Sequence, residues 1–401
     1  MSPTAKYEVI KRIVTRYRTA IKKYKTKILD EFCEICSYSR KYAIWKLNHY
    51  DFNKSKSKPG RPSKYNNPRV REALKQIWIT ANFACGKRLK FMIPEWITFV
   101  DDLDKQERQW LLTMSASTID RILKYYRVKL DIKNRSSTKP GTLLRNSIPI
   151  SGSQWNIDKP RYLEVDSVIH CGASMAGDYV CTINSVDLAT GWNQQRATFN
   201  LGSLGVLTQI KDIERSLPFE LLGLDSDCGG EYINYDLKDY LIKRDNPVEF
   251  TRSRPYKKND NAHIEQKNWT HVRQLIGYIR IDNPKAVALL NDLYKNEWSL
   301  FYNFFIPSFK LISKERIKSK VIKKHDDPKT PYLRVLESEF IPKETKQKLR
   351  QTYKTLNPFD LKKMIAKKLD KITRNSRIKF DKQLVPRVQL ASATPRENML
   401  G

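Results

Sequence analysis

The hydrophobic pattern of this 401-residue chain changes from helical to strand-like near residue 158. Before that point, apolar side chains recur every three or four residues, as in amphipathic helices. After it, three β-rich runs separated by glycine-containing turns predict strands at 162–170, 179–187 and 192–200. Helices and strands then alternate, at about 203–216, 220–225, 234–244, 247–252 and 260–280. The order predicts a multidomain chain whose centre, 158–300, is a mixed α/β sheet covered by helices.

The first 50 residues predict an all-α unit with a basic surface. We expect an amphipathic helix over 5–28, a short helix to about Cys36 and, after a serine-rich turn, a third helix from Arg40. The third helix carries Arg40, Lys41 and Lys46. This pattern indicates a helix-turn-helix DNA-binding domain over 1–50. A plain three-helix bundle with a basic surface is the alternative.

Two polar linkers are predicted on either side of a second helical unit. Residues 51–68 are basic and rich in Pro, Gly and Ser. Arg61 within them could enter a narrow minor groove, although a passive linker explains the segment equally well. Residues 69–130 predict a second helix-turn-helix domain, whose last helix bears Arg121 and Lys124. Residues 131–157 then read as a linker to the core.

Charge is distributed unevenly along the chain. Of the formal net charge of +32, residues 1–157 carry +20, residues 158–300 carry −3 and residues 301–401 carry +15. Such a basic chain indicates a polyanionic partner, most commonly nucleic acid. The last hundred residues predict a basic C-terminal domain with a helical tail. Ordinary solvated extensions around a globular domain are the alternative.

Composition also limits the compartment. Six cysteines are too few for a disulfide-stapled scaffold, which indicates a reducing, cytoplasmic environment. No window approaches ~18 uncharged apolar residues, so we expect no membrane partner. Cys33 and Cys36 form a C-x-x-C pair without a second half. We therefore expect them on the buried face of the second helix rather than on zinc.

Three carboxylates stand out in the central part. Asp166 lies mid-strand, Asp227 ends a strand before Gly229 and Gly230, and Glu265 lies in the first turns of a helix. Such residues can meet at one sheet edge and hold Mg²⁺ or Mn²⁺, which prefer oxygen ligands. Asp225 competes with Asp227, because both have the same parity on the strand. A coincidental triplet among 43 acidic residues is the alternative.

Two metal ions about 3.5–4 Å apart at such a site would clamp the attacking and leaving oxygens of an in-line phosphoryl displacement. The basic loop that follows the strand at 247–252 would hold substrate phosphates beside it, through Arg252, Arg254, Lys257 and Lys258.

Three ordered blocks carry a resemblance to a known family. They are EVDSV around Asp166, SDCGGEY from Ser226 and SRPYKKNDNAHIEQKN from Ser253. The region from about 160 to 300 resembles the catalytic core of DDE integrases and insertion-sequence transposases of the retroviral-integrase superfamily. Thirty-seven residues lie between Asp227 and Glu265, close to the family's spacing of about 35.

The resemblance implies an RNase H-like core and a site made by Asp166, Asp227 and Glu265, so it favours Asp227 over Asp225. It also implies two Mg²⁺ ions, with Mn²⁺ possible, and the cutting and joining of DNA ends. Viral integrases begin with a His-His-Cys-Cys zinc module, whereas residues 1–157 contain only His49. The chain is therefore more similar to bacterial insertion-sequence transposases, which implies a nucleoid-associated protein.

The expected activity is DNA transposition. A homo-oligomer would bind terminal inverted repeats, cleave at the ends and join the 3′-hydroxyls to target DNA. The alternatives are a non-catalytic DNA-binding regulator with a vestigial core and a metal-dependent nuclease that does not join ends.

Near Glu265, Lys267 and Arg273 could reach phosphates, or carry ordinary solvated charge. Trp269 is expected to pack into the core, with stacking on a flipped base as the alternative.

Overall fold

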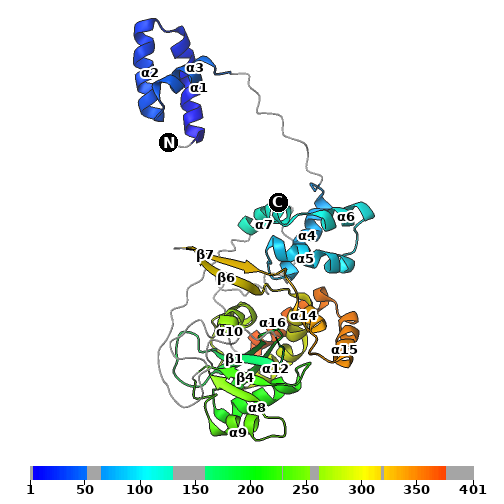
Figure 1. Cartoon of the computed structure of the whole chain (residues 1–401). Helices are drawn as coiled ribbons and strands as arrows, with labels where there is room; N and C mark the ends of the chain where they lie inside the picture. Colours follow the sequence, from blue (N-terminus) through cyan, green and yellow to red (C-terminus); the bar gives the residue numbers. More distant parts are fainter. Residues whose placement is uncertain are drawn as a thin grey trace. The chain divides into compact units, whose positions relative to one another are not determined.

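A computed structural model describes the following parts of the chain: residues 3–51, 65–129, 159–227, 229–252, 262–317 and 320–375. They divide into two compact units, Met1–Lys64 and Tyr65–Gly401 (Figure 1). Most of the two expected linkers lies outside the described residues. The finer sequence-based domain boundaries stay predictions. No described helix is long and apolar enough to cross a bilayer.

The first unit consists of α1 (Pro3–Thr19), α2 (Lys22–Cys36) and α3 (Arg40–Asn48). The expected single helix over 5–28 is wrong, because the chain turns at Ile21, whose backbone is extended and whose side chain is exposed. The turn folds α2 back on α1, so that Ile28 and Phe32 pack with Ile10 and Val14 in one core. A continuous helix would keep these side chains apart.

The second unit begins with four α-helices and a short 3₁₀ turn. They are α4 (Pro68–Thr80), α5 (Gly86–Trp96), η1 (Ile97–Phe99), α6 (Lys105–Thr113) and α7 (Ala116–Lys129). As expected for a capped helix, the Ser115 hydroxyl accepts the Thr118 N–H at 3.2 Å before α7. That the two helical regions are helix-turn-helix units stays a prediction.

The described strands of the central part form a five-stranded mixed sheet in the order β3-β2-β1-β4-β5. Their bounds are β1 (Tyr162–Ile169), β2 (Val180–Asp187), β3 (Asn193–Phe199), β4 (Gly223–Ser226) and β5 (Glu249–Arg252). β1, β2 and β3 pair antiparallel, whereas β4 is parallel to both β1 and β5. The expected mixed α/β architecture is therefore present.

Helices cover both faces of this sheet (Figure 1). Leu163 and Val165 of β1 pack against α8 (Ser203–Arg215) and α9 (Tyr235–Ile242) in one core. The other face packs against a run of helices that continues from the sheet to the end of the described chain. Its first members are α10 (Ala262–Lys267), η2 (Asn268–Arg273), α11 (Gln274–Ile276), α12 (Lys285–Leu293), η3 (Tyr294–Trp298) and α13 (Ser299–Phe305).

The expected helix over 260–280 contains a π-helical segment, η2, and ends at Gly277 with φ of 81°. A π-turn rotates the residues after it relative to α-helical spacing. Trp269, the second residue of η2, is 41% exposed, so the expectation that it packs into the core is wrong.

The C-terminal part contains a hairpin of β6 (Leu311–Ile317) and β7 (Lys320–His325) and the helices α14 (Pro331–Glu337), α15 (Lys343–Lys354) and α16 (Pro358–Asn375). Ile365 and Leu369 of α16 lie in the same core as Trp78 of α4 and Phe301 of α13. These helices therefore pack in one core with α4–α7.

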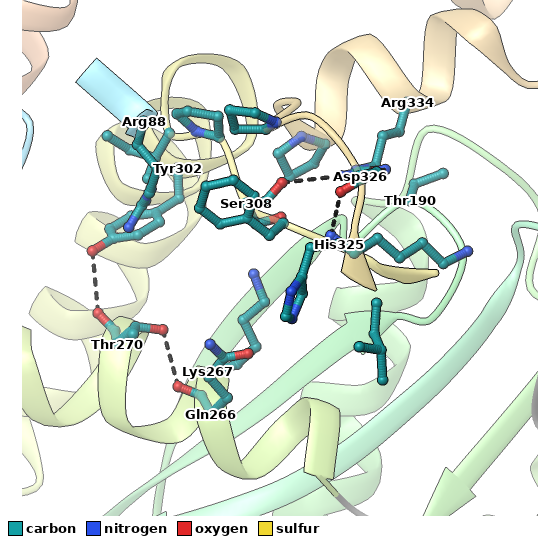
Figure 2. Close-up of a pocket in the computed structure, with 18 of the residues that line it drawn as sticks. Arg88, Thr190, Gln266, Lys267, Thr270, Tyr302, Ser308, His325, Asp326 and Arg334 are labelled. Atoms are coloured by element: carbon teal, nitrogen blue, oxygen red, sulfur yellow. Dashed lines mark hydrogen bonds and ion pairs between the residues drawn. The ribbon is translucent and has the colours of Figure 1, made fainter. Parts of the chain in front are cut away.

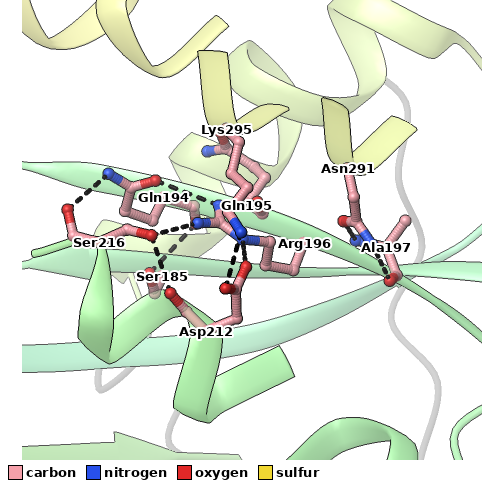
Figure 3. A network of polar contacts seen from close by, with 9 residues as sticks. All are labelled: Ser185, Gln194, Gln195, Arg196, Ala197, Asp212, Ser216, Asn291 and Lys295. Atoms are coloured by element: carbon pink, nitrogen blue, oxygen red, sulfur yellow. Dashed lines mark hydrogen bonds and ion pairs between the residues drawn. The ribbon is translucent and has the colours of Figure 1, made fainter. Parts of the chain in front are cut away.

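A buried ion pair ties β3 to α8 (Figure 3). Arg196 is fully buried and donates from Nε to Asp212 at 2.5 Å and from a terminal nitrogen to Ser216 at 2.6 Å. Burial alone would raise the pKa of Asp212, but hydrogen bonds from Lys295 and Arg196 bring that pKa below its ordinary value.

Candidate active site

Asp166 and Asp227 meet because of the register between two parallel strands. β1 and β4 pair with Val165 beside Ser226. The residues that follow these two, Asp166 and Asp227, therefore lie on the same face of the sheet. Asp166 accepts the Ser167 N–H at 2.7 Å, and Asp227 accepts the Gly229 N–H at 2.9 Å. The glycines after β4 thus form a tight turn that holds the Asp227 carboxylate.

The two carboxylates share a site with excess negative charge. The pKa of Asp166 is raised to about 7, first by burial and then by the charge of Asp227, while hydrogen bonds from Ser167 and Asn268 oppose the rise. Burial also raises the pKa of Asp227, against the Gly229 N–H. Among the described residues neither carboxylate forms an ion pair with Lys or Arg. A bound cation would therefore neutralise the two carboxylates of this site.

Asp225, the competing acid on β4, has a different environment. It is 5% exposed and accepts a hydrogen bond from the Thr251 hydroxyl of β5 at 2.7 Å. Asp227 lies beyond the strand end and is only half-buried. Asp227 is thus the more accessible of the two carboxylates.

Asn268 joins the α10–η2 segment to the acid pair. Its Nδ2 donates to Asp166 at 2.6 Å, and its Oδ1 accepts from Asn184 of β2 at 2.8 Å. Asn184 in turn accepts from Gln195 of β3 at 2.9 Å. A chain of amides therefore fixes the helix against three strands.

Glu265 lies on α10, three residues before Asn268, and α10 packs against β1 and β2. The side chain of Glu265 lies outside the described part of the structure. The backbone thus brings the third predicted acid beside the sheet edge that holds the other two.

Glu231 is an acid that the sequence reasoning missed. Burial raises its pKa, and Asp227 raises it further. It also contributes to the raised pKa of Asp166. The sequence did contain a signal for it, because Glu231 is the second-last residue of the SDCGGEY block that contains Asp227. That tyrosine, Tyr232, is buried and shares a 2.7 Å hydrogen bond with Ser167.

The donor set suits a hard divalent cation. Carboxylate oxygens at a half-buried edge are the ligands that Mg²⁺ and Mn²⁺ prefer. In the part of the chain that the structure describes, no group of three His, Cys, Asp or Glu side chains is placed to hold a metal. Asp166 and Asp227 are thus the two described side chains of a candidate metal centre whose third proposed member is Glu265.

The predicted DNA-binding residues have mixed environments. Arg40 pairs with Asp30, Lys46 lies 5.6 Å from the Tyr42 ring centroid, and Lys41 is exposed. Arg121 and Lys124 are exposed on α7. The remaining predicted residues of the basic loop and the first linker, Arg254, Lys257, Lys258 and Arg61, lie outside the described residues.

Three other predicted phosphate contacts are less exposed. Arg252 is buried at the end of β5. Arg273 donates to the Ile169 carbonyl at 3.0 Å and lies over the Tyr278 ring, so its guanidinium supports packing between η2 and β1. Lys267 points into a cavity on the other side of α10 (Figure 2).

Comparisons with known proteins give one relative that aligns with most of the chain. No protein-family model matches the chain. This chain is 36% identical over 343 residues to the uncharacterized protein y4rM of Sinorhizobium fredii. The alignment covers 83% of this chain and 96% of that protein.

Solved structures similar to the chain include retroviral integrase catalytic cores. The HTLV-2 core, solved with magnesium, is 14% identical with a TM-score of 0.27 and covers 37% of this chain and 90% of that one. An integrase in a simian T-cell lymphotropic virus intasome is 12% identical with a TM-score of 0.31, covering 58% and 70%. The BIV core is 16% identical with a TM-score of 0.27, covering 45% and 95%.

Proposed function

The chain belongs to the same family as the uncharacterized protein y4rM, and we propose from its own residues that it is a DDE transposase. It would bind the terminal inverted repeats of a mobile element, cleave at the ends and join the 3′-hydroxyls to target DNA. The observation that carries the proposal is the pair Asp166 and Asp227, which directly follow the paired residues Val165 and Ser226 of parallel strands and have raised pKa values. The mixed sheet with strand order 3-2-1-4-5 supports an integrase-like core.

In this proposal Asp166, Asp227 and Glu265 hold two Mg²⁺ or Mn²⁺ ions. The bound metal supplies charge stabilisation for the attacking and leaving oxygens of phosphoryl transfer. Asn268 keeps the Asp166 carboxylate oriented through its 2.6 Å hydrogen bond. A vestigial core has no need to keep two like charges together in a half-buried site, which costs folding free energy.

The DNA contacts belong to the proposal as well. Exposed Lys41 on α3, and Arg121 and Lys124 on α7, are available for phosphates or base edges. A homo-oligomer is proposed because two element ends must meet in one complex.

The test is a joining assay with the purified full chain, Mg²⁺ or Mn²⁺, DNA from the ends that flank the gene, and a target plasmid. Asp227→Asn and Glu265→Gln should lower joining by at least about 10³-fold, because each removes a proposed metal ligand, while end binding is retained. Glu249→Gln is the matched control, since it removes an exposed acid from β5 of the same sheet.

The products separate the alternatives. Cut ends without joined products would assign a nuclease, and specific end binding without cutting would assign a regulator. Full activity of Glu265→Gln would remove that residue from the site.

A further inference from the structure

A cavity of about 1030 Å³ lies within the second unit, on the side of α10 that carries Lys267 (Figure 2). Its walls come from α5, the turn between β2 and β3, the α10–η2 segment and the residues that lead into and out of the β6–β7 hairpin. The cavity is therefore built from segments far apart in the sequence. The acid pair itself does not line it.

Two cations enter this cavity from different walls. Arg88 comes from α5 and Lys267 from α10 (Figure 2). Among the described residues neither forms an ion pair or a side-chain hydrogen bond, and Arg88 Nε is buried with no partner. Burial lowers the pKa of Arg88, which reflects the cost of holding its charge away from solvent.

The acids that line the cavity do not neutralise these two cations. Asp326 pairs with Arg334 at 2.7 Å. Asp187 accepts from the Thr190 hydroxyl and from the Arg161 N–H. Asp327 is exposed. Further lysines around the cavity add positive charge: Lys87, Lys90, Lys310, Lys323 and Lys324.

Half-buried charges with no partner among the described residues destabilise a fold, so their retention calls for a ligand. The missing partner is an anion, because both groups are donors without acceptor capacity. A phosphate suits them: the guanidinium fork binds it bidentately and the ammonium binds it as a point charge. Neutral His271, whose pKa burial holds well below its usual value, lines the same wall.

The position of Lys267 connects this cavity to the acid pair. The next residue, Asn268, donates to Asp166. The α10–η2 segment therefore has the carboxylate site on one side and the cavity on the other. A nucleic-acid strand whose scissile phosphate lies at the carboxylates would have neighbouring phosphates within reach of the same segment.

We propose that Arg88 and Lys267 form an anion site that binds a backbone phosphate of the nucleic-acid strand entering the carboxylate site. This inference rests on the proposed function, in that the substrate is a nucleic acid. It adds a residue of the α4–α7 region, Arg88, to the substrate path.

The test measures binding of a fluorescent single-stranded 20-nucleotide DNA to the full chain at several salt concentrations. Arg88→Gln and Lys267→Gln should each weaken binding about tenfold and reduce the salt slope by about one. Lys105→Gln, which removes an exposed lysine of α6 outside the cavity, should change affinity less than about twofold. Inorganic phosphate should displace the DNA only weakly.

Melting temperatures distinguish binding from folding. Both variants should melt at or above the wild-type temperature, because an unpaired buried charge has been removed. Unchanged affinity and salt slope, or lost affinity with a lowered melting temperature, would overturn the inference. Tight binding of inorganic phosphate with unaltered DNA affinity would also overturn it. A wild-type chain that binds DNA through Arg88 and Lys267 but never cuts would instead contradict only the proposed enzyme.

Discussion

At the residue scale, the chain places several ionisable groups where burial changes their chemistry. Asp166 is half-buried beside a second carboxylate, and Lys267 lies in a cavity where no described acid pairs with it. Lys362 of α16 is a third case: it donates to Asn82, lies over the Phe301 ring and has a pKa lowered by burial to about 7. We propose ligands for the first two, whereas core contacts account for Lys362.

Lys362 predicts a pH dependence of stability. Above pH 7 folded Lys362 releases its proton, while the unfolded chain keeps it until about pH 10.4. The unfolded state binds more protons in this window, so the free energy of unfolding rises with pH. In urea unfolding, the free energy of unfolding of wild type relative to that of Lys362→Met should rise by up to about 1.4 kcal/mol per pH unit between pH 7 and 9. Exposed Lys363→Met is the control, and parallel pH profiles for wild type and Lys362→Met would refute the effect.

The sequence could identify Asp166 and Asp227 because strand position and spacing are visible in it. Glu231 lies in the same block as Asp227 and could have been found there, whereas Arg88 could not, because its importance depends on a partner brought close only by folding. Arg88 faces Lys267 across 179 positions of sequence. Nothing in the local pattern around Arg88 marks it as unpaired.

At the element scale, α10 and η2 form the segment on which both proposed sites depend. The amide chain from Asn268 through Asn184 holds this segment to the sheet. The sequence predicted a helix here, but not the π-turn, because the turn accompanies side-chain contacts with distant strands. Similarly, the sequence did not show the turn between α1 and α2 at Ile21, because apolar residues continue at helical spacing across it.

Asn268→Leu should lower the joining rate about 10–100-fold, because Asp166 loses the donor that orients it. Asn268 is a positioning residue, so the rate should fall while DNA affinity and melting temperature change little. A shift of the Mn²⁺ concentration needed for half-maximal rate would distinguish this role from simple loss of structure. An unchanged rate and metal requirement would argue against it.

The β3–α8 ion pair makes a second prediction at this scale (Figure 3). Asp212→Ala leaves the fully buried Arg196 without its ion partner, which should lower the free energy of unfolding by about 3 kcal/mol. Lys295→Ala, which removes the more exposed partner of Asp212, should cost less than about 1 kcal/mol. Equal losses in chemical denaturation would mean that Ser216, the Gln195 carbonyl and the Gln194 side chain are enough to satisfy Arg196.

At the scale of the whole molecule, the chain has two units, each with its own buried core. Residues 1–64 form a compact unit with their own core. Trp96 of α5, in contrast, packs edge-on against Phe301, Phe305 and Phe359. The charge pattern predicted basic flanks around a neutral centre, but it could not show that α4–α7 share the core of the C-terminal helices.

Deleting residues 1–64 should therefore leave a folded chain, because the second unit has a buried core of its own. We expect near-wild-type melting, lost selectivity for element ends and retained salt-sensitive binding to any DNA. Deleting residues 1–130 should instead destabilise the core, because it removes Trp78 and Trp96. Selective end binding by residues 65–401 would assign recognition to that unit.

The most direct measurement is anomalous diffraction from crystals of the chain soaked in Mn²⁺. We predict Mn²⁺ about 2.0–2.4 Å from carboxylate oxygens of both Asp166 and Asp227, with Glu265 completing the site. The peak should disappear in Asp166→Asn crystals. A saturating soak that places Mn²⁺ elsewhere, or leaves these oxygens without metal in the presence of bound DNA, would contradict the proposed metal centre.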